Sequence, residues 1–374
     1  MDGGIVFLQT AMPLLVVRLG ASAMLLGTIG WVAQAVRLPV CLASGQMSER
    51  VGRARIIVPA ACGCALGCGL MAFARSPLTI MALYVLALAS IGAFFAPLQA
   101  MIGDMSERGQ LRKNLGAYNV GWCVGSAVAA LCAPALVGAG LPAAFYAGAG
   151  ANLMAAVLVL SWRRGHAARA AVEEAQDSAD SYPTYGSLLL IARMGHFVSY
   201  FGYSTIRILF PKYAITGLGW SEVTVATVVA LQLVGLGAGI LVANASAWWR
   251  GKLWPQIAAQ LVMMVCAGSV LWVRSPMLLG GAFFGFGAAQ SVVYTSALYY
   301  GLSGRKDRGR NTGIHESLVA AGGITGCLLG GIVGQEIALV APFGVLAGLA
   351  GLCLLVTIAV WRLRRPGRNA GFAC

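Results

Sequence analysis

The sequence predicts an all-α membrane protein of about twelve transmembrane helices in two six-helix, pseudo-symmetric halves. Composition, the spacing of apolar runs and the placement of charge carry this prediction. Of the 374 residues, 59% are hydrophobic and only 10% are charged, whereas soluble domains carry about 25% charged residues. So few charges cannot cover a water-exposed surface, and the outer surface is expected to face membrane lipid. The net charge of +14 is then explained by membrane orientation, and no nucleic-acid partner is expected.

Apolar runs of membrane-spanning length follow one another along the whole chain. A bilayer core about 30 Å thick needs roughly 20 apolar residues per helix. The first run is barely long enough and starts two residues after the first Met, so either this helix is short or the chain start is not the natural one. In order, the expected helices are 3–18, 21–43, 55–75, 77–102, 115–138, 141–162, 185–212, 221–247, 253–273, 276–300, 312–335 and 338–361.

One polar stretch interrupts this series between the sixth and seventh runs. Residues 163–184 are small, polar and mixed in charge, and they hold four of the twelve acidic residues. Such composition is typical of a linker. We therefore expect an N-terminal six-helix half at 1–162, a cytoplasmic linker at 163–184, and a C-terminal six-helix half at 185–374 that ends in a short basic tail.

The two halves also match each other in sequence. Asn114-Leu-Gly116 opens the fifth run and Asn311-Thr-Gly313 opens the eleventh, an offset of 197 residues. At nearly the same offset, Gly52-Arg53 follows the second run and Gly251-Lys252 follows the eighth. Two halves of the same orientation are the parallel-repeat plan of one large class of membrane carriers.

Basic residues gather in the turns that follow even-numbered runs. The positive-inside rule places these turns, and with them both termini, in the cytoplasm. The compact loops favour a bacterial inner (plasma) membrane. The basic residues in question are Arg50, Arg53, Arg55, Arg108, Arg112, Lys113, Arg163, Arg164, Arg169, Arg250, Lys252, Arg305, Lys306, Arg308 and Arg310, with four arginines in the tail.

The turn after the second run carries a recognisable motif. It reads Gly45-Gln-Met-Ser-Glu49-Arg50-Val-Gly52-Arg53, followed by Ala54 and Arg55. Glycines permit a tight turn, and arginines can pair with a nearby carboxylate. This resembles the signature loop of the major facilitator superfamily (MFS), with Glu49 in place of Asp and Ala54 where a basic residue is usual.

The resemblance implies a secondary transporter with helices 1, 4, 7 and 10 around a central cavity. It also implies that the loop of Gly45, Glu49, Arg50, Gly52 and Arg53 is a gating loop, which bridges the halves at the cytoplasmic face and latches the outward-open state. Glu49 would then meet the start of the eleventh run, with Arg112 or Arg310 as its partner. The alternative is that these arginines only set topology. Ser126 replaces the Pro of the family's antiporter motif, so that motif does not support export by proton antiport.

Polar residues inside the seventh run predict a solute or ion pathway. His196, Tyr200, Tyr203 and Arg207 follow an i, i+4, i+7, i+11 spacing, so they share one helical face, which Arg193 extends. A lipid-facing stripe of this kind would be costly, so the face is expected to line a watery cavity. Alternatively, the arginines snorkel to the interfaces, Arg207 above all.

Further candidates lie on other runs. Arg37, Gln99, Gln290 and Tyr294 are polar residues within the second, fourth and tenth runs and join the predicted pathway. A cytoplasmic gate is predicted where the repeat pairs two segments, and plain capping of the eleventh helix by Glu316 is the alternative. The gate residues are Tyr118, Asn119, His315 and Glu316.

The expected function is alternating-access transport of a small organic solute, anionic or amphiphilic given the cationic face of the seventh run, with protons as candidate coupling ions. A non-transporting membrane scaffold or sensor on the same fold is the alternative. The sequence contains no nucleotide-binding loop, metal-ligand cluster or nucleophile motif, so we expect no enzymatic activity, cofactor or metal.

Overall fold

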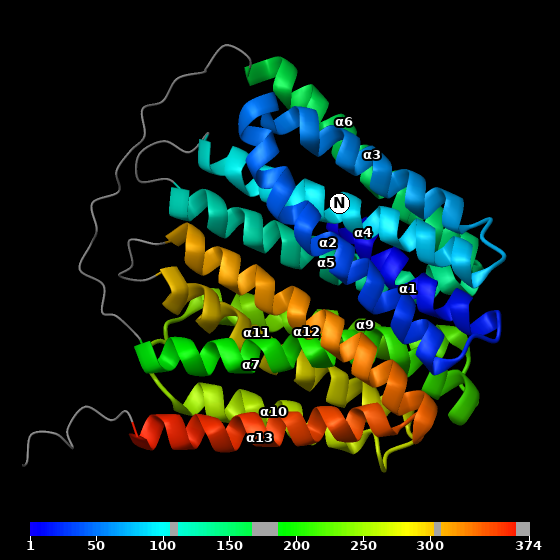
Figure 1. Ribbon diagram of the computed structural model, residues 1–374, viewed down its shortest axis with the longest axis vertical. Coiled ribbons are helices and arrows are strands. Elements are labelled where there is room, and N and C mark those ends of the chain that lie inside the picture. Colours follow the sequence, from blue (N-terminus) through cyan, green and yellow to red (C-terminus); the bar gives the residue numbers. More distant parts are fainter. Residues whose placement is uncertain (105–110, 167–185, 303–307, 364–374) are drawn as a thin grey trace, which may run out of the picture.

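The computed structural model describes residues 1–104, 111–166, 186–302 and 308–363, and the regular elements of this part of the chain are all helices (Figure 1). The first half contains α1 (Asp2–Arg18), α2 (Ala23–Val51), α3 (Arg53–Met71), α4 (Pro77–Asp104), α5 (Leu111–Ala139) and α6 (Leu141–His166). The second half contains α7 (Gly186–Ser204) with its continuation η1 (Thr205–Leu209), α8 (Phe210–Lys212) and η2 (Tyr213–Gly217), then α9 (Glu222–Ala245), α10 (Trp254–Ser269), α11 (Pro276–Leu302), α12 (Arg308–Glu336) and α13 (Ala341–Leu363).

These elements form twelve helical segments, which confirms the predicted fold class. In Figure 1, α1–α6 occupy the upper part and α7–α13 the lower part, with all helices running across the bundle. Nine helices in the described residues are long and apolar enough to cross a membrane. Of the other segments, α1 and α10 are shorter, at 17 and 16 residues. Large apolar side chains such as Trp272 and Met277, 83% and 87% exposed, lie on the outer surface, as a lipid-facing protein requires.

Equivalent turns in the two halves share their local chemistry. Ser22 before α2 and Ser221 before α9 both accept a hydrogen bond from the backbone N–H three residues later, which caps the helix start. Gly52 after α2 and Gly251 after α9 both have a positive φ, 98° and 69°. Side chains rarely adopt this region, so both halves need glycine at this turn.

The seventh segment departs from the expected helix at 185–212. Two π-helical turns, η1 and η2, carry it on to Gly217. Pro211 explains the first, because it has no N–H to donate and its ring would clash with the carbonyl of Arg207 four residues earlier. Single π-helical turns within α-helices are frequent at functional sites.

Several other predicted boundaries shift by a few residues, among them the ends of the second and sixth helices. The second helix runs to Val51 rather than 43, because the polar residues of the motif continue the helix until Gly52 ends it. The sixth helix runs to His166, beyond the predicted start of the linker at 163, and residues 167–185 lie outside the described part of the chain.

The two halves meet closely at one end of the bundle, here called the Arg18 end. The Arg18 guanidinium forms a two-pronged ion pair with Glu222, with 2.6 Å from Nη2 to Oε2. Lys212 donates to the Ala21 carbonyl at 2.6 Å. Beneath these contacts α2 packs on α12 so closely that a Cβ added at Gly27 would lie 2.5 Å from the Cys327 carbonyl oxygen.

Toward the opposite end, here called the Gly52 end, α2 and α12 diverge (Figure 1). Leu42 and Met47, on the last turns of α2, are 57% and 50% exposed. The halves are therefore joined at the Arg18 end and part toward the Gly52 end.

Candidate functional site

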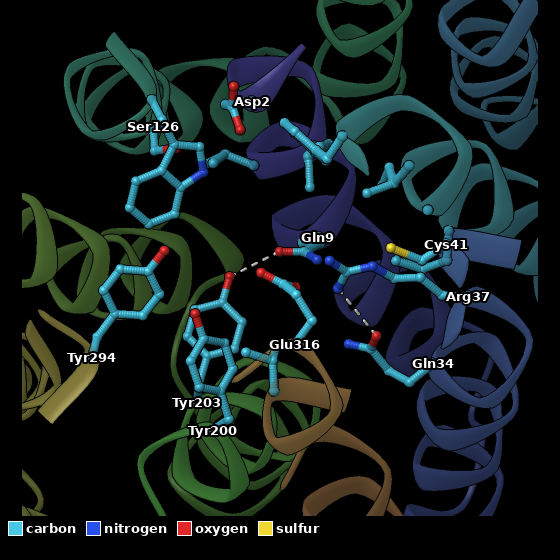
Figure 2. A pocket seen from close by; sticks show the side chains of 18 of the residues that line it. Asp2, Gln9, Gln34, Arg37, Cys41, Ser126, Tyr200, Tyr203, Tyr294 and Glu316 are labelled. Atoms are coloured by element: carbon cyan, nitrogen blue, oxygen red, sulfur yellow. Dashed lines mark hydrogen bonds between the residues drawn. The ribbon is translucent and has the colours of Figure 1, made fainter. Parts of the chain in front are cut away.

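A cavity of about 190 Å³ lies between the halves (Figure 2). The first half contributes α1, α2, α4 and α5, and the second contributes α7, α9, α11 and α12. Eight residues of the predicted pathway and gate line it: Arg37, Gln99, Tyr118, Asn119, Tyr200, Tyr203, Tyr294 and Glu316. Residues from distant runs thus share one space.

Opposite charges face this cavity from the two halves. Arg37 projects from α2 and donates a 3.4 Å hydrogen bond to Gln34. Glu316 projects from α12, and Figure 2 shows its carboxylate directed toward Gln9 and Arg37. Asp2 adds a second carboxylate. A cation and carboxylates in one pocket suit a solute with polar or charged groups.

The remaining wall is largely aromatic. Trp122 on α5 stacks on Tyr294 of α11, with ring centroids 6.2 Å apart and an interplanar angle of 13°. Tyr200 and Tyr203 lie 5.7 Å apart on α7, and the Tyr203 hydroxyl donates to Gln9 at 3.0 Å. Flat rings with polar tips bind apolar bodies while still offering hydrogen bonds.

Two predicted histidines lie behind this aromatic wall instead of in the cavity. His196 on α7 and His315 on α12 are 0% and 3% exposed. Their rings stack with centroids 4.1 Å apart at 19°. Tyr200 and Tyr294 pack against the pair, with centroids 5.0 Å from His196 and His315 respectively. The structure thus brings the seventh and eleventh runs together through these two side chains.

Arg193 and Gln290 also lie away from the cavity lining. Arg193 donates to the Asn311 side chain at 2.6 Å, which ties α7 to the first turns of α12. Gln290 is fully buried within the second half. Arg193 therefore contributes to helix packing, whereas Gln290 is placed by its burial alone.

Arg207 is buried, which differs from the snorkelling alternative. It is 2% exposed, its Nη2 lies 3.3 Å from the Thr10 hydroxyl, and its guanidinium carbon lies 5.4 Å from the centre of the Tyr203 ring. It lines a second, small cavity of about 10 Å³ that shares Gln9, Gln34 and Tyr203 with the central one.

The motif between α2 and α3 folds back on itself. Gly52 reverses the chain, so the Arg53 guanidinium reaches the Ser48 hydroxyl at 2.8 Å and the Glu49 carboxylate at 3.8 Å. Glu49 remains 68% exposed at its side chain, and Arg50 is also exposed. Gly45 supplies a carbonyl to Arg53 at 3.4 Å.

The predicted latch from Glu49 to the eleventh run stays a prediction. The side chains of both suggested partners, Arg112 and Arg310, lie outside the described part of the chain.

Several cavity residues were not predicted. Gln9 and Gln34 are amides inside apolar runs, the same signal that marked Gln99, and Gln34 lies one helical turn before Arg37 on the same face. Trp122 carried no such signal, because a Trp in an apolar run more often faces lipid or the interface. Its cavity position follows from helix packing.

Comparison with known proteins agrees with this architecture. The sequence profile described as Major Facilitator Superfamily matches residues 2–300 and 192–373. No curated protein sequence matches the chain.

Three similar solved structures are transporters. One is a bacterial homologue of the human lysosomal transporter Spinster in an inward-facing, occupied conformation, with a TM-score of 0.70 at 14% identity over 97% of this chain and 94% of that one. A variant of the nucleoside transporter NupG has a TM-score of 0.69 at 12% identity over 96% and 98%. The human organic anion transporter MFSD10 has a TM-score of 0.58 at 17% identity over 95% and 98%.

The signature turn, the twelve-helix architecture and the profile match over most of the chain lead to one assignment: the chain belongs to the major facilitator superfamily of membrane transporters.

Proposed function

We propose that the chain is a secondary transporter that moves a small organic solute by alternating access through the central cavity. The observation that carries this proposal is the cavity itself, which takes charged and aromatic side chains from both halves. A site at the interface of two repeats is exposed to one side or the other as the halves rock. Because the halves meet at the Arg18 end, the cavity opens toward the Gly52 end.

The charge of its turns supports a cytoplasmic position for the Gly52 end. Its turns carry the clusters of arginine and lysine, and positive turns remain in the cytoplasm. The conformation is then inward-facing, in a bacterial inner membrane, with both termini cytoplasmic.

The lining suggests the class of solute. Aromatic rings beside Arg37 and Glu316 suit an amphiphilic organic molecule, and the cationic side chains favour one with an anionic group. Similar folds carry nucleosides and organic anions, according to the names of two neighbours. Glu316 is the candidate for proton coupling, because a carboxylate reached by water through the cavity can take up a proton. A scaffold or sensor, the alternative function, has no need of such a lining.

Uptake by proteoliposomes of a metabolite extract, with mass spectrometry of the lumen, tests the proposal. We expect some metabolites to accumulate with the wild-type protein and not with Arg37→Gln or Glu316→Gln. Matched controls are Arg274→Gln and Glu336→Gln, two exposed residues outside the cavity, which should transport normally. Equal accumulation in empty liposomes would contradict transport, whereas normal uptake by both cavity variants would contradict this site.

A further inference from the structure

Arg207 is a buried, charged side chain with hydrogen-bond partners for only some of its donors. A guanidinium has five N–H donors and no acceptor. One of its nitrogens contacts Thr10 and its plane lies over Tyr203. Its Nε and Nη1 have no hydrogen-bond partner among the described residues. A buried charge left in this condition is costly, and in a membrane protein it marks a functional site.

The described acidic residues do not compensate this charge. The ion pairs between described residues join Arg18 to Glu222 and Arg53 to Glu49. The acids of the central cavity, Asp2 and Glu316, do not reach the small cavity beside Arg207. The positive charge is therefore available to an anion from outside the chain.

The small cavity adjoins the central one. Gln9, Gln34 and Tyr203 line both, so these side chains separate Arg207 from the solute space. At about 10 Å³ the small cavity has room for roughly one water-sized group. A carboxylate would enter as Tyr203 releases Gln9, whose 3.0 Å hydrogen bond joins the two side chains at this boundary.

We propose that Arg207 binds the anionic group of the transported solute, a carboxylate or an oxyanion of similar size. The planar guanidinium matches the two oxygens of a carboxylate. The apolar body of the solute then lies against Tyr200, Tyr203 and Tyr294 in the central cavity. This inference rests on the proposed transport function and specifies its substrate class. Arg207 lies on the π-helical turn η1 of the seventh segment.

Matched pairs of acids and amides test the inference. Thermal unfolding of the full-length protein is followed in a buffer of low ionic strength, without chloride or added carboxylate, with benzoate, 3-phenylpropionate, indole-3-acetate and octanoate, each beside its neutral primary amide. In the wild-type protein we expect at least one acid to bind about tenfold or more tightly than its amide, because a hydrogen bond to a charged group is worth at least that factor. In Arg207→Gln the two members should bind alike.

Two further variants keep the test decisive. Arg274→Gln removes an exposed arginine that also lies over a tyrosine, 5.8 Å from the Tyr213 ring centre, and should retain the wild-type preference. Arg207→Lys keeps the positive charge but loses the planar guanidinium that can bind both carboxylate oxygens, so its preference for acids over amides should fall. This variant provides the test if Arg207→Gln does not fold. A preference unchanged in the Arg207 variants, or no acid bound by the wild type, would overturn the inference.

Inorganic anions offer the same chemistry, and a chloride titration separates the two sources. Chloride that stabilises the wild type but not Arg207→Gln, with acids and amides indistinguishable, would assign the anion to an inorganic ion and overturn the solute assignment. Uptake of neutral or cationic metabolites that depends on Arg37 and Glu316 would leave the transport function standing while the Arg207 inference fails.

Discussion

Gly27 on α2 should decide how stable the closed Arg18 end is. A Cβ at this position would lie 2.5 Å from the Cys327 carbonyl oxygen and 2.8 Å from the Gly331 Cα. Both are backbone atoms, so side-chain motion cannot relieve the overlap. Ordinary contact begins at 3.4 Å, so Gly27→Ala requires α2 and α12 to separate by about 0.9 Å, the difference between 3.4 and 2.5 Å.

The cost follows from packing. Overfilling a close-packed contact costs about 1–3 kcal/mol. In the proposed alternating-access cycle, this cost falls only on the conformation in which the Arg18 end is closed. The equilibrium between the two conformations should therefore shift roughly 5- to 150-fold toward opening of the Arg18 end.

Alkylation of Cys41 measures this shift. Cys41 lines the central cavity and is made the only cysteine by replacing the others with Ala. In the proposed cycle, opening of the Arg18 end closes the other end. The rate of labelling by a water-soluble maleimide from the Gly52 end should therefore fall in Gly27→Ala, by at most the factor through which the equilibrium shifts.

Gly150→Ala is the matched control, because a Cβ there has open space around it, and its labelling should equal that of the parent. Equal labelling of the Gly27→Ala protein and its parent would refute the link between this contact and the conformational equilibrium.

Three other substitutions test separate features. Arg18→Glu should weaken closure of the Arg18 end by about 1 kcal/mol, as expected for a partly exposed ion pair. Adding Glu222→Arg should restore closure in the same labelling assay. If closure does not recover, the ion pair makes no contribution. Gly52→Ala should destabilise the protein by about 1–3 kcal/mol, because φ is 98° there, so an unchanged unfolding midpoint would contradict the need for glycine. His315→Phe should change the midpoint by no more than about 2 °C, because its ring stacks on His196 and its nitrogens have no hydrogen-bond partner in the described residues; a large loss would reveal a polar role.

Helix positions were predictable from the sequence because each transmembrane helix is apolar over a length set by the bilayer. The ends were less so. The last turns of α2 are polar, yet they remain helical until Gly52 reverses the chain. The extension to Gly217 depends on how Pro211 disturbs the turn before it, which apolar runs do not record.

The site was predictable to the extent that one helical face identifies it. Tyr200 and Tyr203 were predicted from their polarity and spacing within an apolar run, and both line the cavity. The predicted face of the seventh run does not line the cavity as a whole, however. His196 instead stacks on His315, which lies 119 positions away along the chain. Such a partner depends on which helices pack together. The burial of Arg207 likewise follows from Thr10 on the opposite half, which no local pattern reveals.

The stack of Trp122 on Tyr294 has a consequence for the proposed transport cycle. The two rings belong to different halves and lie nearly parallel, and they contact each other through their faces without a hydrogen bond between them. When the halves part, no donor or acceptor loses its partner at this point, and the uncovered faces become available to the apolar part of an entering solute. In the proposed cycle, a solute with an apolar face can therefore replace one aromatic contact with another at the centre of the cavity.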